Sequence, residues 1–302
     1  MSSSAAASYL TSSSPLWVAG RALLARRGIE LFACWSRTGK SPDHTAIHEL
    51  RNASRRVREC ILFFSPCYKS GDSIRLSRKL NKLIDLLGAI RSIDEALLLM
   101  ELIVEEVSPH GKESLGEMMH QLCLERKVAA RRAGRLLRKT RRSSLAALFK
   151  ELNLPPDLFG ANEIDPFMPV RRYVCDRLRQ TLTEMGPLAT ANYIAADGEA
   201  RQRWNTAAKN LHKLLELLAP VMKRVPPEIV QMMLASYQEL LRTLHDLSNF
   251  QLLLEKLVKD GDTLQELTRI ITSKQTLVRI KLNTLQEEQP WERLLARIEE
   301  CL

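Results

Sequence analysis

Apolar residues recur three and four positions apart along most of the 302-residue chain, which is the spacing of one face of an α-helix. The segment HELRNASRRVRECILFFSP at 48–66 is a clear case, because its apolar stripe ends at Pro66, which has no backbone donor to continue a helix. No segment shows the convincing alternation of a strand. The pattern predicts helices over residues 16–36, 43–64, 73–107, 112–151, 170–194, 198–219, 226–259 and 262–287, and a short last helix from Trp291.

Two segments interrupt this pattern. SRTGKSPD at 36–43 is expected to be a loop, and NLPPDLFG with the DPFMP that follows predicts a break near 154–169. Leu, Ala, Glu, Arg and Lys dominate the composition and Gly is scarce at 12 residues, which favours helix almost everywhere. The expected fold class is therefore all-α.

The break lies near the middle of the chain, and the two halves resemble each other. At an offset of 154 residues Pro66 meets Pro220, and LLGAIRSIDEALLLMEL (86–102) meets LLRTLHDLSNFQLLLEK (240–256) with no gap and with most apolar positions in common. We interpret the chain as two repeat-related helical bundles. The expected organisation is a Ser/Ala-rich tail with a leading helix (1–40), a first bundle (41–152), a connection (153–169) and a second bundle (170–302).

A second stripe on the 43–64 helix carries His48, Arg51, Arg55 and Arg58, about 100° from the apolar stripe. No Asp or Glu lies on this stripe, and like charges one turn apart repel each other by about 0.2–0.5 kcal/mol per pair. The second half keeps the helix and dilutes the cations, with Gln202, Asn205, Lys209 and His212 at the equivalent positions. The helix itself therefore does not require the cations, although a solvated face remains the alternative to a binding surface.

The positive charge belongs to the first half of the chain. The formal net charge is +10, and residues 1–152 hold 26 Lys and Arg against 15 Asp and Glu, whereas residues 153–302 hold 19 against 20. A basic surface confined to one half favours a polyanionic partner: nucleic acid, an anionic membrane surface or a phosphate polymer.

The six Cys residues form no CxxC pair, which favours reduced thiols and a cytoplasmic protein. The first 15 residues lack the positive start of a signal peptide, and no run of about 18 apolar residues predicts a membrane span.

The motif H-x-x-R-x-x-x-R-R-x-R at 48–58, followed by an apolar helix and Pro66, resembles the opening signature of the CHAD family, the conserved-histidine α-helical domains. LLGAIRSID at 86–94 is similar to the next block of that family, with Ser92 in place of its first Asp. The resemblance runs from about residue 40 to the C-terminus and is weaker in the second half.

The resemblance implies two pseudo-symmetric four-helix bundles with a basic groove or channel between them. It also implies binding of inorganic polyphosphate, at polyphosphate granules in the cytoplasm. No alternating Glu/Lys strands of a CYTH triphosphatase module are visible, so we expect a stand-alone member of the family.

Other cations could line the same groove, and a solvated face or a local ion pair is the alternative for each. Arg forks match phosphate oxygens, so a row of them suits a ligand with a charge on every unit. The predicted polyphosphate-binding residues are His48, Arg51, Arg55, Arg58, Lys79, Lys82, Arg91, Lys127, Arg131, Arg135, Arg138, Lys209 and His212.

Two other functions remain open. Nucleic-acid binding could use the same cations, although aromatic residues make up only 5% of the chain and do not interleave with the Arg stripe. Catalysis on polyphosphate is ranked lower, because phosphoryl transfer requires carboxylates that hold a metal beside the cations. We predict no catalytic residue, no metal site and no cofactor; protein partners stay unspecified.

Overall fold

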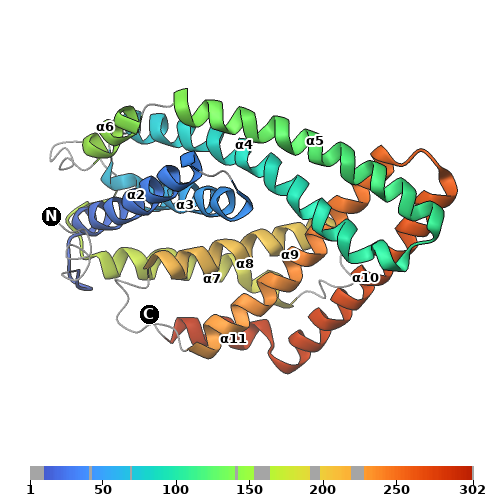
Figure 1. The fold of residues 1–302 in the computed structure, drawn as a ribbon. Coiled ribbons are helices and arrows are strands. Elements are labelled where there is room, and N and C mark those ends of the chain that lie inside the picture. The colour runs from blue at the N-terminus through green and yellow to red at the C-terminus, as the bar shows by residue number, and fades with distance from the viewer. Residues whose placement is uncertain are drawn as a thin grey trace.

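The computed structural model describes residues 10–40, 43–68, 70–139, 142–152, 164–190, 198–218 and 228–300. Within these ranges the regular structure is helical, apart from one isolated bridge near residues 15 and 169 (Figure 1). The helices are α2 (Leu16–Lys40), α3 (His44–Phe63), α4 (Ser70–Ile103), α5 (Pro109–Lys139), α6 (Arg142–Leu152), α7 (Val170–Thr190), α8 (Gly198–Leu218), α9 (Glu228–Leu257), α10 (Gly261–Glu288) and α11 (Trp291–Glu299), with short 3₁₀ turns at Ser65–Cys67 and Val104–Glu106.

The all-α prediction is confirmed, and two of its boundaries need correction. The predicted loop at 36–43 is helical as far as Lys40, because the Thr38 hydroxyl lies 3.0 Å from both the Cys34 carbonyl one turn back and the Ala46 carbonyl of α3. Residues 41 and 42 lie outside the described ranges. The single helix predicted over 112–151 is two helices, α5 and α6, and Phe149 of α6 packs against Phe32 of α2.

Local signals in the sequence account for where α3 begins and ends. Asp43 caps its N-terminus, since the Asp43 carboxylate accepts a hydrogen bond of 2.8 Å from the Ala46 amide. The helix stops at Phe63, shortly before Pro66. Its apolar face is buried, with Ile47, Leu50 and Val57 at most 1% exposed. Because this face is buried, the neighbouring stripe with His48, Arg51 and Arg55 lies at the edge of the bundle.

The first two helices of each half begin at equivalent positions. α2 and α7 start at residues 16 and 170, and α3 and α8 start at 44 and 198, so both pairs are 154 residues apart. Each helix from α2 to α5 also contacts its equivalent, in the pairs α2 with α7, α3 with α8, α4 with α9 and α5 with α10. The halves therefore meet through matching helices.

The backbone makes a reciprocal exchange just before α2 and α7. The Leu16 amide donates a hydrogen bond to the Met168 carbonyl at 2.9 Å, and the Val170 amide donates to the Ser14 carbonyl at 2.8 Å. The offset of 154 relates Leu16 to Val170 and Ser14 to Met168. The repeat therefore converts each of these two hydrogen bonds into the other. A two-fold relation produces this kind of exchange; the symmetry of the two whole bundles stays a prediction.

One continuous core joins the elements that will position the site. It includes Leu16, Leu23 and Leu31 of α2, so the leading helix packs with the first bundle. Buried aromatic residues occur in both halves, and in the second half Tyr237 meets Trp291 edge to face at 5.2 Å. None of the described helices is long and apolar enough to cross a membrane.

Candidate functional site

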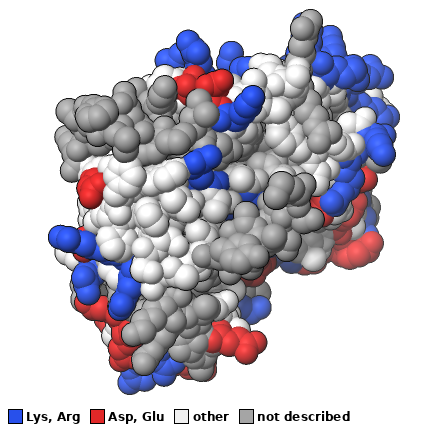
Figure 2. All heavy atoms as spheres, turned by 90° about the vertical axis from the view of Figure 1, so that its left-hand side faces the viewer, with Lys and Arg blue, Asp and Glu red and all other residues white. Residues whose placement is uncertain are grey.

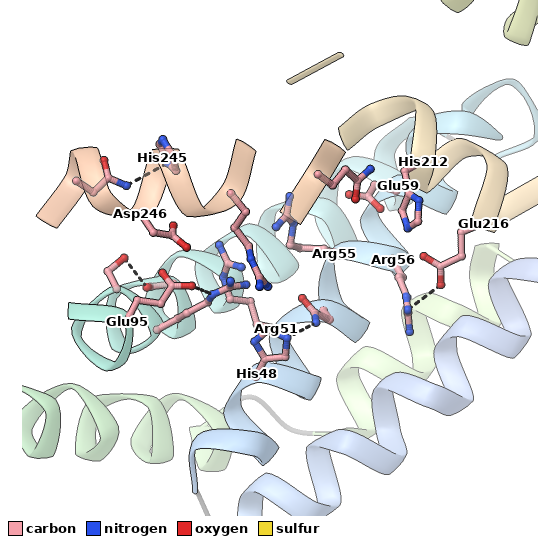
Figure 3. A pocket seen from close by; sticks show the side chains of 17 residues that line it. His48, Arg51, Arg55, Arg56, Glu59, Glu95, His212, Glu216, His245 and Asp246 are labelled. Carbon is pink, nitrogen blue, oxygen red and sulfur yellow. Dashed lines mark hydrogen bonds and ion pairs between the residues drawn. The ribbon is translucent and has the colours of Figure 1, made fainter. Parts of the chain in front are cut away.

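A groove of about 480 Å³ lies where the two halves meet, with α3 and α4 on one side and α8 and α9 on the other (Figure 3). Polar side chains dominate it: the described lining residues include five Arg, three His and four Asp or Glu. The residues that line it are His48, Arg51, Asn52, Arg55, Arg56 and Glu59 of α3; Gly88, Arg91, Ser92 and Glu95 of α4; His212 and Glu216 of α8; and Gln238, Arg242, His245, Asp246 and Asn249 of α9.

Equivalent positions of the repeat face each other across this groove. The α4 residues at 88, 91, 92 and 95 match the α9 residues at 242, 245, 246 and 249, again 154 apart. The side chains differ, so Arg91 has His245 as its counterpart and Ser92 has Asp246. Each copy of the repeat thus contributes the equivalent surface to the groove, and the two surfaces carry different charges.

Arg51 and Arg55 are the arginines of the groove that form no ion pair within the described part of the chain. Both are half-buried and point into the space between the helices (Figure 3). The Arg51 Nε atom is buried and has no hydrogen-bond partner there. Burial lowers the pKa of both guanidinium groups and neighbouring Arg charges lower it further, whereas the charge of Glu95 near Arg51 and that of Glu59 near Arg55 oppose the shift. Both groups nevertheless stay charged, because arginine titrates far above neutral pH.

The Arg51 guanidinium lies beside Gly88 of α4. A methyl group built at residue 88 would lie 3.5 Å from Arg51 Nε and 3.7 Å from its Nη2, which are ordinary van der Waals distances. The position therefore has room for an alanine, and the contact places Arg51 against the LLGAIRSID block without requiring its glycine.

His48 lies beside these arginines at one end of the α3 stripe. The Asn52 amide donates a hydrogen bond of 2.8 Å to His48 Nε2, which keeps that nitrogen unprotonated. Burial lowers the pKa of His48 below its ordinary 6.5, and Arg91, His44, Arg51 and Arg242 add to the effect. Both effects favour the neutral form of His48.

The other groove cations already have acidic partners. Arg91 pairs with Glu95 one turn along α4, Arg56 reaches Glu216 of α8 at 2.7 Å, and Arg242 contacts both Glu239 oxygens at 2.7 Å. The sequence predicted a cationic stripe on α3 without carboxylates. In the folded protein, carboxylates from α3, α4, α8 and α9 also line the groove that this stripe faces. With neutral imidazoles the described lining has one positive charge in excess, and with protonated ones it has four.

The predicted residues divide into those that reach the groove and those that do not. His48, Arg51, Arg55, Arg91 and His212 line it. Arg58 instead turns to α4, where its Nη1 donates to Asn81 Oδ1 at 3.3 Å. Lys209 belongs to α8, and its side chain lies outside the described part of the structure.

The remaining predicted cations lie on other surfaces. Lys79 donates to the Ser144 hydroxyl of α6 at 2.7 Å and lines a separate pocket between α4 and α6. Lys82 is exposed on α4. The row Lys127, Arg131, Arg135 and Arg138 is exposed on α5, and Figure 1 places α4 between α5 and α9. None of these residues lines the groove, so a binding role for them stays a prediction.

Sequence reasoning missed the α9 wall, which consists of Gln238, Arg242, His245, Asp246 and Asn249. The signal was present in the repeat, because residues 242–249 align with the block that includes Arg91. No group of three or more His, Cys, Asp or Glu residues suited to a metal ion occurs within the described ranges.

Comparison with protein families identifies the fold and its relatives. The model of the CHAD domain matches residues 22–255, most of the chain. The chain belongs to the CHAD domain family. The groove of this CHAD domain therefore contains the H-x-x-R-x-x-x-R motif and the LLGAIRSID block that first suggested the family.

Solved structures agree with this assignment of the fold. The chain is similar to PptA from Streptomyces chartreusis, with a TM-score of 0.65 and 14% identity over 91% of this chain and all of that one. It is also similar to the CHAD domain from the plant Ricinus communis, with a TM-score of 0.64 and 17% identity over 96% of this chain and 93% of that one. The search of curated proteins found no significant match.

Proposed function

We propose that this CHAD domain binds linear inorganic polyphosphate in the groove between α3, α4, α8 and α9, without catalysis. The observation that carries the proposal is the state of Arg51 and Arg55, two half-buried guanidinium groups that face the groove with no ion pair in the described chain. The two groups repel each other, and the buried Arg51 Nε donor has no hydrogen-bond partner there. A string of phosphates would supply both negative charge and acceptors.

The chemistry of the lining favours a ligand that consists of phosphate alone. Its described residues include no Phe, Tyr or Trp, so nothing there offers the stacking platform that single-stranded nucleic acids use. Arg51 and Arg55 are one turn apart on α3, about 6 Å along the helix axis. A flexible chain with acceptors on every unit can meet such a row at successive phosphates.

Binding rather than catalysis fits the carboxylates of the groove. Glu95 and Glu216 are engaged by Arg91 and Arg56, and a carboxylate in an ion pair is poorly placed to hold a metal ion beside a phosphate. Association with polyphosphate granules in the cytoplasm is the setting that we expect for such a binding module.

A competition titration at near-physiological salt tests the proposal. Labelled long-chain polyphosphate would be displaced from the full chain by unlabelled polyphosphate, duplex DNA, single-stranded RNA, heparin or short phosphates. We expect only polyphosphate to compete well. The affinity should fall steeply with salt, because binding releases counterions from the polymer. Equal competition by DNA or RNA would show that the groove selects charge alone and would overturn the assignment to polyphosphate.

A further inference from the structure

The exposed face of α5 is a row of cations without acidic partners. Between residues 126 and 139 this helix has seven Lys or Arg and no Asp or Glu. Arg126 pairs with Asp94 of α4, but no ion pair within the described chain involves the other six, which are Lys127, Arg131, Arg132, Arg135, Arg138 and Lys139. We call these six residues the α5 row.

Helix stability explains only part of this row. Arg138 and Lys139 lie in the last turn, where cations stabilise the negative end of the helix dipole. Lys127, Arg131 and Arg135 lie earlier, at spacings of four residues, where like charges cost about 0.2–0.5 kcal/mol per pair. Their combined positive charge favours an anionic partner from outside the protein.

The α5 row is connected to the groove through α4. Arg58, next along the α3 stripe after Arg55, donates to Asn81 of α4, and the following residue, Lys82, is exposed and forms no ion pair within the described chain. The Arg126–Asp94 pair sets the antiparallel register of α4 and α5. Asn81 is thirteen residues back from Asp94, and Lys139 is thirteen residues on from Arg126, so Arg58 meets α4 at the level of Arg138 and Lys139, the C-terminal end of the α5 row.

The path from the groove to the α5 row therefore passes Arg55 and Arg58 and continues from Arg138 along α5 to Lys127, with Asp85 as an exposed carboxylate of α4. Lys82 does not lie on it, because the separation of nine residues between Lys82 and Arg91 puts these two side chains on opposite faces of α4. Figure 2 shows the end of the molecule where α6 lies, and Lys and Arg side chains gather along its upper right edge, at the height of α4 and α5 in Figure 1.

We propose that a polyphosphate chain longer than the groove leaves it past Arg58, crosses α4 near Asn81 and lies along the α5 row. The groove spans about 12 Å along α3, from His48 to Arg56, and the α5 row adds about 16 Å from Lys127 to Arg138. This inference rests on polyphosphate binding in the groove and adds a preference for long chains. The lack of aromatic residues in the row, and its continuity with the groove, favour the same polymer over nucleic acid.

The test compares a short polyphosphate, no longer than the groove, with long-chain polyphosphate. The α5 variant is Arg131→Gln with Arg135→Gln and Arg138→Gln, and the groove variant is Arg51→Gln with Arg55→Gln. The control is Arg269→Gln with Lys281→Gln, which removes two exposed cations of α10 that form no ion pair within the described residues. Circular dichroism would check that each variant keeps its helices.

We expect the α5 variant to bind long chains about ten-fold more weakly, with a flatter salt dependence, and to bind short chains like the unmodified protein. The proposal is overturned if long-chain affinity is unchanged, if both chain lengths weaken equally, or if the α5 variant loses only duplex DNA binding.

The same experiment separates this inference from the proposed function. If the groove variant binds short chains as well as the unmodified protein does, polyphosphate binding in the groove itself is wrong. If the groove variant loses both chain lengths while the α5 variant loses neither, the groove stands and the outer path is wrong.

Discussion

The two walls of the groove come from equivalent helices and differ in charge. The α3–α4 wall has Arg51 and Arg55 with no ion pair in the described chain, and Arg91 in a pair with Glu95. The α8–α9 wall has Arg242, which Glu239 already neutralises, and places a histidine where the first wall has Arg91. The first copy of the repeat thus supplies four of the five arginines in the described lining, and the second supplies one.

This difference indicates that the two walls contribute unequally to the affinity for a polyanion. A polyanion gains most from cations that lack partners before it arrives, because no existing ion pair has to break. The first wall should therefore supply most of the affinity, and the second should adjust it. Four predictions test this comparison.

The largest effect is expected from Arg51→Gln with Arg55→Gln. Each hydrogen bond between charged groups contributes about 1.5–3 kcal/mol, so we expect polyphosphate affinity to fall by a factor of about 100 or more. The helices should persist, since these side chains lie outside the apolar face of α3. Isothermal titration calorimetry measures the change, with Arg269→Gln and Lys281→Gln as the control. A loss of folding without a specific binding defect would contradict this prediction.

A smaller loss is expected on the opposite wall. Arg242→Gln removes a cation that is exposed and already shared with Glu239, so the affinity should fall by about five- to ten-fold. Lys256→Gln, also exposed on α9 and outside the groove, provides the matched control. If Arg242→Gln is as damaging as the loss of Arg51 and Arg55, the two walls contribute equally and the comparison fails.

Making the second wall more like the first should tighten binding. Asp246→Ser places there the residue that α4 has at the equivalent position 92 and removes a carboxylate from the groove. Loss of one nearby repulsion of about 1 kcal/mol corresponds to roughly a five-fold gain in affinity. Glu255→Ser, exposed on the same helix, is the control. Unchanged or weaker binding would show that Asp246 does not oppose the ligand.

The smallest expected effect concerns pH. The pKa of His48 is lowered in the free protein by burial and by Arg91, His44, Arg51 and Arg242, and a bound polyanion offsets those charges and raises it. Binding then takes up a proton, so affinity should rise as pH falls through the range below 6.5. Protonation makes Nε2 a donor, so Asn52 must present its oxygen to it.

Calorimetry in buffers of different ionisation enthalpy measures this proton uptake. His48→Gln should reduce it and leave a remainder from His212 and His245, which also line the groove. Free-protein stability should show the opposite trend. Because the folded pKa of His48 is below its ordinary value, its contribution is complete above pH 6.5 and is lost as pH falls further. Proton uptake that is the same in the variant would exclude His48 as the group that responds.

Much of the first wall could be predicted from the sequence, because its signals are local. The stripe of Arg51 and Arg55 follows from helical spacing, and Asp43 and Pro66 mark the ends of the helix that presents it. The repeat offset of 154 also predicted which helices match.

The rest depends on contacts between distant helices. Spacing shows that Lys127 and Arg138 share a face of α5, but not that α4 separates this face from the groove. Lys79 is occupied by Ser144 of α6, 65 positions away in the chain, which no local pattern indicates. Arg242 belongs to a degenerate copy of its motif and gains meaning only when α9 faces α4.

The reciprocal backbone exchange before α2 and α7 fastens the two halves at one end, and the groove opens along the surface where they meet. A polymer held by both walls would then act as a removable crosslink. It would couple the two halves, because the halves could separate only after the polymer dissociates from one wall. Because one core spans both halves, the empty and the loaded protein should each unfold in a single step. The loaded protein should unfold at a higher temperature, because the polymer binds only while both walls are in place.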